Sequence, residues 1–289
     1  MSKINAKMRK QEKLMELIRS ALAEDIGDND ITTRAIVDTY KPGKALIVAK
    51  ETGILAGIDI VKQTFSLLEG EVQFETSYKN GDKIVLNDTI IKIKGSVQSI
   101  LKGERTALNF LAHLSGISTL TAKYVREVQG TRAKITDTRK TTPLFRLLEK
   151  EAVCSGGGIN HRMGLYDMFL IKENHIAAAG GIQEAVSKCK QYLAENRLKL
   201  KIEVETTDLT QVRETVSCDV DQIMLDNMNL DTMREAVDII SGRSIVEASG
   251  NVSLDNVRSI AKTGVDLISV GALTHSVPAF DFSLLLEGT

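Results

Sequence analysis

Six short apolar runs decide the fold: AKITDT (133–138), DMFLIK (167–172), KIEVE (201–205), QIMLD (222–226), SIVEA (244–248) and DLISV (266–270). They have the apolar, β-branched composition of strands that are covered on both faces. Their predicted ends lie at Thr138, Lys172, Glu205, Asp226, Ala248 and Val270, in steps of 34, 33, 21, 22 and 22 residues. Each step leaves room for a crossover helix. Six parallel strands in series favour a β/α barrel over an open sheet.

The first half of the chain has a different texture. Apolar residues recur at helical spacing from Lys7 to about Asp25, and Gly27 follows as a stop signal. Between Lys44 and Gly95, short apolar runs with a turn signal at Asn80-Gly81 predict a mostly antiparallel sheet. The chain is therefore expected to open with a helix and a sheet that precede the barrel.

A long helical segment follows this sheet. We expect it from about Val97 to Leu114, interrupted near Ser115-Gly116 and resuming toward Gln129. Beyond it the pattern changes to alternating strands and helices, which places a domain boundary along this segment.

The size and charge of the chain exclude several classes of protein. Its 289 residues predict roughly two domains, or one large barrel with an appendage. With 43% hydrophobic and 26% charged residues, the composition is that of a folded globular protein rather than a disordered or disulfide-stapled one. The net charge of −1 provides no positive field for nucleic acid or membrane lipid, so an anionic ligand has to meet a local cluster of cations.

The spacing of the cysteines indicates the compartment. Cys154, Cys189 and Cys218 are odd in number and far apart, without metal-ligand spacing, which predicts reduced thiols in the cytoplasm. The N-terminus shows no apolar run with a cleavage site, and no stretch approaches the length of a membrane span. We therefore expect neither a targeting segment nor a membrane role.

Chemistry concentrates at the predicted carboxyl ends of the strands, where a β/α barrel carries its reactive groups. Early strands supply cations, middle strands supply carboxylates, and the last two supply small residues. A single charge in a loop is explained as simply facing solvent, but that explanation weakens for a set that shares one rim. The set comprises Arg139, Lys140, Lys172, Asn174, His175, Glu205, Asp226, Asn227, Ser249, Gly250, Asn251, Gly271 and Ala272, with His161 and Arg162 in an intervening loop.

These residue types predict two anionic ligands and a metal. Glu205 and Asp226 suit hydrated Mg²⁺, which one or two carboxylates commonly hold together with substrate phosphates. The small residues after the last two strands expose backbone N–H groups and suit a phosphate. The cations suit a second anion, because Arg matches carboxylate geometry bidentately.

The segment SGGGINHR (155–162) has two interpretations. Its glycines form either a mobile linker or a closely packed loop that delivers His161 and Arg162 to the rim. The pattern is neither a dinucleotide fingerprint nor a Walker loop. Cys154 and His161 could form a nucleophile and its base, but the sequence shows no oxyanion donor or third residue to complete such a site. We therefore do not expect a nucleophilic cysteine.

Arg105 is out of place on the long helix. It lies on the same stripe as Leu101, Leu108 and Ala112, where an apolar side chain is expected. Its cation either extends to solvent or enters a buried site, for example in a neighbouring subunit.

Motifs along nearly the whole chain carry a family resemblance. They are ALAEDIGDNDITT, GERTALNFLAHLSGIST, TDTRKTTPLFRLLEKEAV, GGGINHRMGLYDMFLIKENHI, IEVE, IMLDNM, VEASGNV and GVDLISVGALTHSVPAFDFSL. Through them the sequence resembles the quinolinate phosphoribosyltransferase family, also called nicotinate-nucleotide pyrophosphorylase (carboxylating). The departures are local: Leu144-Phe145 follows Pro143 where the family often has Gly-Leu, and Glu173 replaces a common Asp.

The resemblance implies an α/β protein with an N-terminal α/β sandwich domain (1–115) and an open, incomplete β/α barrel (116–274). It implies a C-terminal tail (275–289) that returns to the first domain. It also implies a homodimer or a higher homo-oligomer with active sites shared across the interface. No nucleic acid or membrane partner is expected.

The resemblance further implies a role for each rim residue. Quinolinate is expected to contact Arg105, Arg139, His161, Arg162 and Lys172, with Arg105 supplied by a partner subunit. Phosphoribosyl pyrophosphate is expected to contact Lys140, Glu205, Asp226, Ser249, Gly250 and Gly271. The implied catalytic residues are Lys140, Lys172, Glu205 and Asp226. Glu205 and Asp226 are the implied ligands of Mg²⁺, directly or through water.

The implied activity is phosphoribosyl transfer to quinolinate with decarboxylation. Its products are nicotinate mononucleotide, pyrophosphate and CO₂, in de novo NAD biosynthesis. Alternatives within the fold are a transferase for another heterocyclic acid and a molybdenum-associated relative. A non-catalytic phosphosugar-binding protein is the alternative from another class. The number of cations favours a dicarboxylate substrate.

Overall fold

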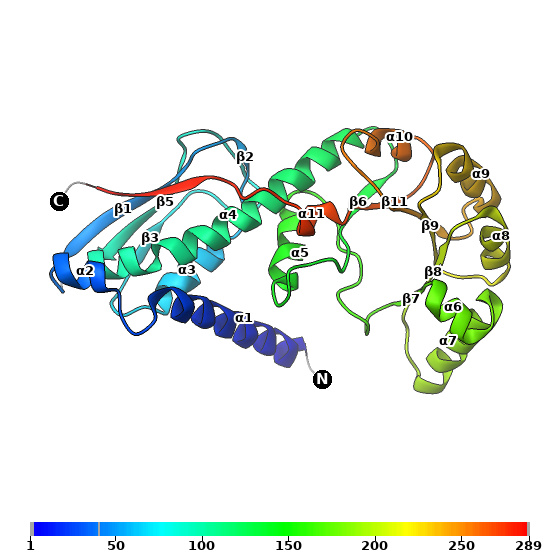
Figure 1. Ribbon diagram of the computed structural model, residues 1–289, viewed down its shortest axis with the longest axis horizontal. Coiled ribbons are helices and arrows are strands. Elements are labelled where there is room, and N and C mark those ends of the chain that lie inside the picture. Colours follow the sequence, from blue (N-terminus) through cyan, green and yellow to red (C-terminus); the bar gives the residue numbers. More distant parts are fainter. Residues whose placement is uncertain (1–2, 40, 288–289) are drawn as a thin grey trace. The chain divides into compact units, whose positions relative to one another are not determined.

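The chain forms two compact units in the computed structural model, which describes residues 3–39 and 41–287. The first unit comprises Met1–Thr119 and Val277–Thr289, and the second comprises Leu120–Ser276. Helix α4 (Val97–Glu127) continues from the first unit into the second (Figure 1). Among the described residues, no helix has the length and apolar character that crossing a membrane requires.

The first unit is an antiparallel sheet with helices packed on it. Its four-stranded sheet has the order β12-β1-β5-β3, so a strand from the end of the chain pairs with the first strand. Strands β2 and β4 form a second, two-stranded sheet. The elements are α1 (Lys3–Ile26), α2 (Ile31–Ile36), β1 (Pro42–Ala49), β2 (Gly53–Ile54), α3 (Ile58–Ser66), β3 (Gln73–Glu75), β4 (Lys83–Ile84), β5 (Thr89–Ser96) and β12 (Phe282–Leu286).

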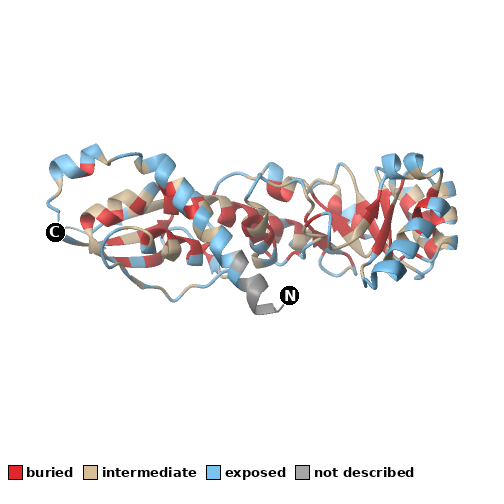
Figure 2. Ribbon diagram, turned by 90° about the horizontal axis from the view of Figure 1, so that it is seen from below, coloured by how far each residue is buried: buried red, intermediate tan, exposed pale blue. Residues whose placement is uncertain are grey.

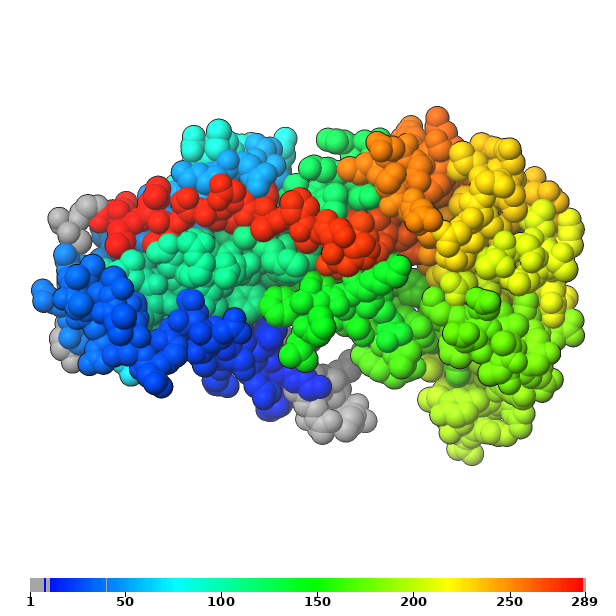
Figure 3. Space-filling view, in the orientation of Figure 1, coloured from blue at the N-terminus to red at the C-terminus, as the bar shows by residue number. Residues whose placement is uncertain are grey.

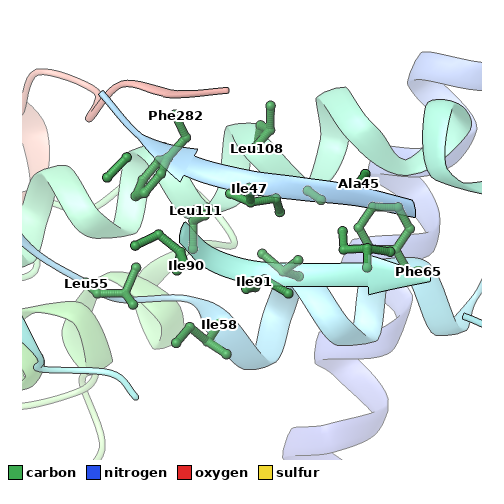
Figure 4. Close-up of a cluster of buried hydrophobic side chains, with 14 of the residues drawn as sticks. Ala45, Ile47, Leu55, Ile58, Phe65, Ile90, Ile91, Leu108, Leu111 and Phe282 are labelled. Atoms are coloured by element: carbon green, nitrogen blue, oxygen red, sulfur yellow. The ribbon is translucent and has the colours of Figure 1, made fainter. Parts of the chain in front are cut away.

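One face of the four-stranded sheet buries the core of the first unit. Ala45 and Ile47 of β1 stand opposite Ile93 and Ile91 of β5, and all four are buried. Phe65 of α3 packs against this cluster (Figure 4). Each fully buried Ile or Phe side chain contributes about 1.5–3 kcal/mol to folding. The alternation of apolar and polar residues along β5 therefore sets which face meets the helices.

Helix α3 lies within the region for which we expected a mostly antiparallel sheet. Ile58, Val61 and Phe65 are buried at helical spacing, but this pattern spans a single nine-residue helix among other apolar runs. Asn80 Oδ1 accepts hydrogen bonds from the N–H groups of Gly57 (2.9 Å) and Ile58 (3.2 Å), so it caps the helix from a distant turn. A cap supplied from 22 residues away is not readable from local sequence.

Helix α4 is continuous, so the interruption predicted at Ser115-Gly116 was wrong. Ser115 Oγ donates to Ala56 O and accepts from Ala56 N, each at 3.1 Å. A Cβ atom on Gly116 would lie 2.3 Å from Pro278 O. The small residues let neighbouring segments pack closely, which outweighs the cost of about 1 kcal/mol for glycine inside a helix. Figure 3 shows the C-terminal segment (red) along this helix (teal).

The second unit is built on six parallel strands in the order β6-β11-β10-β9-β8-β7. Strand β6 pairs with β11 rather than β7, so the sheet curls round and the barrel stays open between β6 and β7. The predicted fold class is confirmed. The elements are β6 (Lys134–Thr136), α5 (Arg146–Ser155), β7 (Phe169–Ile171), α6 (Glu173–Ala179), α7 (Ile182–Asn196), β8 (Ile202–Thr206), α8 (Leu209–Ser217), β9 (Gln222–Asp226), α9 (Leu230–Ile240), β10 (Ile245–Ser249), α10 (Val257–Ala261), β11 (Leu267–Ser269) and α11 (Ala272–His275).

The strands of the second unit are mostly buried beneath helices whose outer faces are exposed (Figure 2). Strand β9 ends at Asp226 as predicted, and β8 and β10 end one residue later than predicted. Strand β6 ends at Thr136, two residues earlier than predicted, and β7 and β11 each end one residue earlier than predicted. The parallel sheet therefore brings its carboxyl ends to one rim.

Candidate active site

A cavity of about 590 Å³ lies at the carboxyl ends of the strands of the second unit. It collects every residue to which the resemblance assigned a substrate, metal or catalytic role, except Arg105. Arg105 is exposed on α4 within the first unit. The cavity is lined by Thr138, Arg139, Lys140, His161, Arg162, Leu170, Lys172, Glu205, Met224, Asp226, Asn227, Glu247, Ser249, Gly250, Asn251, Ser269 and Gly271.

Three rim residues from the sequence pattern do not line this cavity. Asn174 and His175 lie in the first turn of α6, and His175 Nδ1 accepts a hydrogen bond from Lys172 N (3.0 Å). Ala272 begins α11. These residues shape the helix starts that follow β7 and β11 rather than the cavity itself.

Arg139 and Arg162 form the cationic side of the cavity. Arg139 Nε is inaccessible to solvent and has no hydrogen-bond partner among the described residues. Arg162 donates to Met168 O (3.2 Å), and burial together with the charge of Arg139 lowers the pKa of Arg162. Arg146, which the sequence pattern did not single out, donates to Arg139 O (3.4 Å) and Met163 O (3.1 Å). It therefore orders the loops that carry both cations.

The imidazole of His161 is held between protein groups. Nε2 lies 3.0 Å from Glu203 Oε2 and 3.4 Å from Glu247 Oε2. Burial disfavours the imidazolium, but hydrogen bonds and charges from Glu203 and Glu247 raise the pKa of His161 to about 10. The N–H of Arg162 donates to Nδ1 (2.8 Å) and opposes this shift, because it favours the unprotonated nitrogen.

Glu203 and Glu247 are the main residues of the site that sequence reasoning missed. Both are fully buried, and Gln222 Nε2 donates to Glu203 Oε1 (2.7 Å) and Glu247 Oε2 (2.6 Å). Burial first, and then the charge of Glu247, raise the pKa of Glu203 to about 7. The available signal was a carboxylate inside each of two apolar strands. Side-chain alternation puts Glu203 on the same face as Glu205, two residues along β8.

The cluster of His161, Glu203 and Glu247 has ligand atoms within 4.8 Å of one another, a spacing that could hold a metal ion. A metal needs the lone pair of Nε2, with a hydrogen on Nδ1. Here Nδ1 accepts the N–H of Arg162, so a neutral ring carries its hydrogen on Nε2, which lies 3.0 Å from Glu203 Oε2. A neutral or a protonated ring therefore lacks the free Nε2 lone pair that a metal site needs.

Glu205 and Asp226 lie on the neighbouring strands β8 and β9, and Asp226 stands beside Ser249 of β10, next to the glycine turn at Gly250. Lys172 Nζ lies 3.3 Å from Glu205 Oε2, so a predicted cation and a predicted metal ligand form an ion pair. Asn227 Nδ2 donates to Asp226 Oδ2 (2.8 Å). All of the carboxylate and amide acceptors here are oxygen atoms, the donor set that hard divalent cations prefer.

The small residues leave backbone close to the cavity. Gly250 has φ +95°, and a Cβ atom there would lie 2.2 Å from Asn227 Oδ1. A Cβ atom on Gly271 would lie 3.2 Å from Lys140 Cδ. The main chain of Lys140 is itself held, because Thr274 Oγ1 donates to Lys140 O (2.7 Å). Glycine is therefore required at Gly250 by both conformation and space.

The loop between α5 and Arg162 is closely packed. Ile159 N donates to Ile135 O (2.9 Å), and Ile159 forms a parallel bridge with Thr136 beside edge strand β6. A Cβ atom on Gly158 would lie 2.8 Å from Val153 Cγ1. These contacts favour the loop that delivers His161 and Arg162 over a mobile linker. Partial desolvation of the Cys154 sulfur, and then the charge of Asp137, raise the pKa of this thiol, which does not favour a thiolate nucleophile.

A second cavity of about 460 Å³ lies at the opposite, amino ends of the strands. Asp221 and Asp266 there accept hydrogen bonds from Ile202 N (2.8 Å) and Val246 N (2.9 Å). Arg132 pairs with Asp266 at 2.5 Å. These charged groups are occupied in holding the strand starts, so we place the chemistry at the carboxyl ends.

Comparison with known proteins points to one family. The model "Quinolinate phosphoribosyl transferase, N-terminal domain" matches residues 30–115, and the corresponding C-terminal domain matches residues 117–285. The chain is 43% identical to a "Probable nicotinate-nucleotide pyrophosphorylase [carboxylating]" of Bacillus subtilis, covering 94% of this chain and 92% of that protein. It is 42% identical to "Quinolinate phosphoribosyltransferase [decarboxylating] 1" of Nicotiana glauca, covering 95% of this chain and 82% of that protein. The solved nicotinate-nucleotide pyrophosphorylase of Francisella tularensis superimposes with a TM-score of 0.91 at 41% identity, covering 96% of both chains.

Proposed function

Because the chain belongs to the quinolinate phosphoribosyltransferase family, we propose that the carboxyl-end cavity transfers a phosphoribosyl group from phosphoribosyl pyrophosphate to quinolinate with loss of CO₂. Similarity over nearly the full chain supports this activity in de novo NAD biosynthesis. One observation carries the assignment to this cavity. Cations, carboxylates and small residues from different strands converge there, in a volume of about 590 Å³.

The dicarboxylate is assigned to the cationic side. Arg139, Arg162 and Lys172 supply the charge, with His161 beside them as part of the same wall. The buried, unpaired Nε of Arg139 supports this assignment, because a buried donor without a partner costs about 1–3 kcal/mol until a ligand satisfies it. A substrate with two carboxylates uses two such cations at once.

Phosphoribosyl pyrophosphate and the metal are assigned to the other side. The family uses a divalent metal, and we infer Mg²⁺ at Glu205 and Asp226, directly or through water. The all-oxygen donor set supports this ion. When bound, Mg²⁺ offsets the charge that grows on the leaving pyrophosphate. Lys140 contacts the reacting groups, and the backbone at Ser249, Gly250 and Gly271 holds the 5-phosphate.

The reaction needs positioning and electrostatic stabilisation from the chain. The lone pair of the pyridine nitrogen forms a bond to C1 of the ribose while the bond from C1 to the pyrophosphate oxygen breaks. The C2-carboxylate bond then breaks, CO₂ leaves, and the electron pair stays on C2 beside the cationic nitrogen until C2 is protonated. Arg139, Arg162 and Lys172 orient the dianion, and Lys140 stabilises the charge that develops. The ion pair between Lys172 and Glu205 places the cationic side of the cavity next to the carboxylate side.

We infer a homodimer or higher homo-oligomer in which Arg105 of a partner subunit completes each site. The exposure of Arg105 supports this, because it lies on a stripe whose apolar residues are buried (Leu108) or half-buried (Leu101 and Ala112), yet its own side chain is accessible to another chain. We also infer a cytoplasmic location, which the three free thiols support.

The test is a product assay with quinolinate, phosphoribosyl pyrophosphate and Mg²⁺, with nicotinate as the parallel substrate. We expect nicotinate mononucleotide and CO₂ from quinolinate alone, measured by chromatography and gas capture. Turnover of nicotinate instead would keep the phosphoribosyl site but overturn the dicarboxylate assignment. Binding of both substrates by calorimetry without any turnover would identify a non-catalytic binding protein.

A further inference from the structure

Asp137 and Lys150 form a buried ion pair next to the site, and nothing in the reaction uses them. Asp137 follows β6 directly and Lys150 lies on α5, with side chains that are 0% and 1% exposed. Lys150 Nζ contacts Asp137 Oδ1. Neither residue lines the cavity. Burying two charges costs several kcal/mol for each ion, which the attraction between them often fails to recover. Such a pair calls for an explanation beyond stability.

The two charged groups also hold the main chain of His161. Asp137 Oδ1 accepts a hydrogen bond from His161 N (3.0 Å), and Lys150 Nζ donates to His161 O (3.0 Å). Both polar main-chain groups of this residue are therefore bonded to a buried charge. Charge-assisted hydrogen bonds are about twice as strong as neutral ones, so they fix this peptide more firmly than an ordinary loop contact would.

Asn160 extends the same contacts to the preceding residue. With its amide oriented to donate, the nitrogen lies 2.6 Å from Asp137 Oδ2 and 2.9 Å from Lys150 O. Asp137 thus accepts through both of its oxygens. The ion pair holds two consecutive residues of the loop against the edge of β6.

The side chain of His161 is held from the other direction by Glu203 and Glu247, as described above. Its Nδ1 accepts a hydrogen bond from the main-chain N–H of Arg162 (2.8 Å), so the position of the imidazole restrains the main chain of Arg162. The main chain of His161 is hydrogen-bonded to buried charges, and its ring lies within ion-pair distance of two more. Arg162 is the cation that follows, and it lines the cavity.

We propose that Asp137 and Lys150 are positioning residues that fix His161 and Arg162 for the dicarboxylate substrate without touching either substrate. This inference rests on the proposed function. The proposal predicts that only one substrate is affected. Weakening the ion pair displaces His161 and Arg162 on the cationic side of the cavity, whereas the contacts of Glu205 and Asp226 do not involve the pair. Quinolinate binding therefore depends on the pair, and phosphoribosyl pyrophosphate binding does not.

The alternative is that the pair only joins α5 to β6. The double variant Asp137→Asn/Lys150→Met separates the two explanations, because it removes both charges together and leaves no unpaired ion in the interior. If the pair is merely structural, a folded double variant keeps the wild-type KM for quinolinate. If the pair positions His161 and Arg162, the KM for quinolinate rises on the order of tenfold to 100-fold, while the KM for phosphoribosyl pyrophosphate stays within about threefold.

The matched control is Arg132→Met/Asp266→Asn, which removes an ion pair at the opposite ends of the strands. We expect wild-type KM values for both substrates in this control. Folding of each variant is checked by circular dichroism and thermal unfolding. A folded Asp137→Asn/Lys150→Met protein with an unchanged quinolinate KM would overturn the proposal, as would an equal rise in both KM values.

A second variant covers the case in which the double variant does not fold. Asn160 is exposed, so Asn160→Ala is expected to fold and removes only the extension of the ion pair. We expect the Kd for quinolinate, measured by calorimetry, to rise about threefold to tenfold with unchanged binding of phosphoribosyl pyrophosphate. An unchanged quinolinate Kd overturns the proposal. Wild-type protein that fails to bind quinolinate at all would instead overturn the proposed function, so the two failures are distinct.

Discussion

The two ends of the barrel strands both carry charged side chains, but the protein uses them differently. At the amino ends, Asp221 and Asp266 accept backbone hydrogen bonds, and Arg132 pairs with Asp266. At the carboxyl ends, Arg139 has a buried Nε without a partner among the described residues. Charges that the protein itself satisfies maintain the fold, whereas charges left unsatisfied in a cavity mark the place for a ligand.

The largest expected effect is the loss of activity when Arg139, at the carboxyl ends of the strands, is replaced. Arg139→Ala should lower kcat/KM on the order of 100-fold to 1,000-fold, because it removes charged donors to the substrate. Its free energy of unfolding should change by less than about 1 kcal/mol, since the buried Nε makes no protein hydrogen bond. Arg132→Ala is the control and should keep wild-type turnover. Steady-state kinetics and thermal unfolding check both variants, and wild-type-like turnover of Arg139→Ala would refute the contrast.

The second largest effect is expected if the carboxyl-end cavity needs a residue from a partner subunit. Arg105→Ala and Lys172→Ala should each be inactive alone. In an equal mixture that exchanges subunits, half of the dimers are hybrids with one intact site, so about a quarter of wild-type activity should return. The activity assay is run after subunit exchange has been verified by mass spectrometry of tagged chains. No recovery in exchanged mixtures would show that Arg105 does not act across an interface.

A smaller effect concerns the buried charges beneath the cavity. The folded-state pKa of His161 is raised from 6.5 to about 10, so the folded protein binds a proton that the unfolded chain releases above pH 6.5. This contribution to stability is complete below pH 6.5 and is lost as pH rises through about 10, with a slope of up to about 1.4 kcal/mol per pH unit.

Denaturant unfolding at pH 7 and pH 9 measures this contribution. Wild-type protein should lose more stability over this interval than His161→Gln, which lacks the titrating group. Lysine and tyrosine titrate in both proteins, so their effects cancel in the difference. Equal losses would mean that the imidazole is neutral throughout, as the Arg162 N–H bond to Nδ1 favours.

The smallest expected effect is at Leu144, in the loop that follows the carboxyl end of β6. Leu144 has φ +67° and is 86% exposed, an unfavourable conformation for a leucine with little packing in return. Leu144→Gly should raise the free energy of unfolding by about 0.5–1 kcal/mol after the entropy cost of glycine. Chemical denaturation provides the measurement. A loss of stability would indicate that Leu144 packs against another chain.

Much of the site could be predicted because its residues stand at the ends of recognisable apolar strands. Lys172, Glu205 and Asp226 were placed at strand ends by pattern alone, and they line one cavity in the structure. The roles assigned to them remain predictions. Glu203 and Glu247 were missed because a charge inside an apolar strand indicates only the face of the sheet on which it lies. It does not indicate which side chains from other strands meet it there. Their importance arises only when β8, β9 and β10 bring them to the same His161.

The motifs along the chain identified the family. Strand periodicity and residue chemistry, which are local properties, predicted the class of fold and the order of cations, carboxylates and small residues along the rim. The contacts between distant segments became known only from the folded structure. It placed the cap of α3 on Asn80, kept α4 continuous at Gly116, left Arg105 exposed and put Asp137 and Lys150 around the main chain of His161. Each of these depends on hydrogen bonds or close contacts between residues that are far apart in the sequence. Local sequence patterns do not show which of these residues meet in the fold.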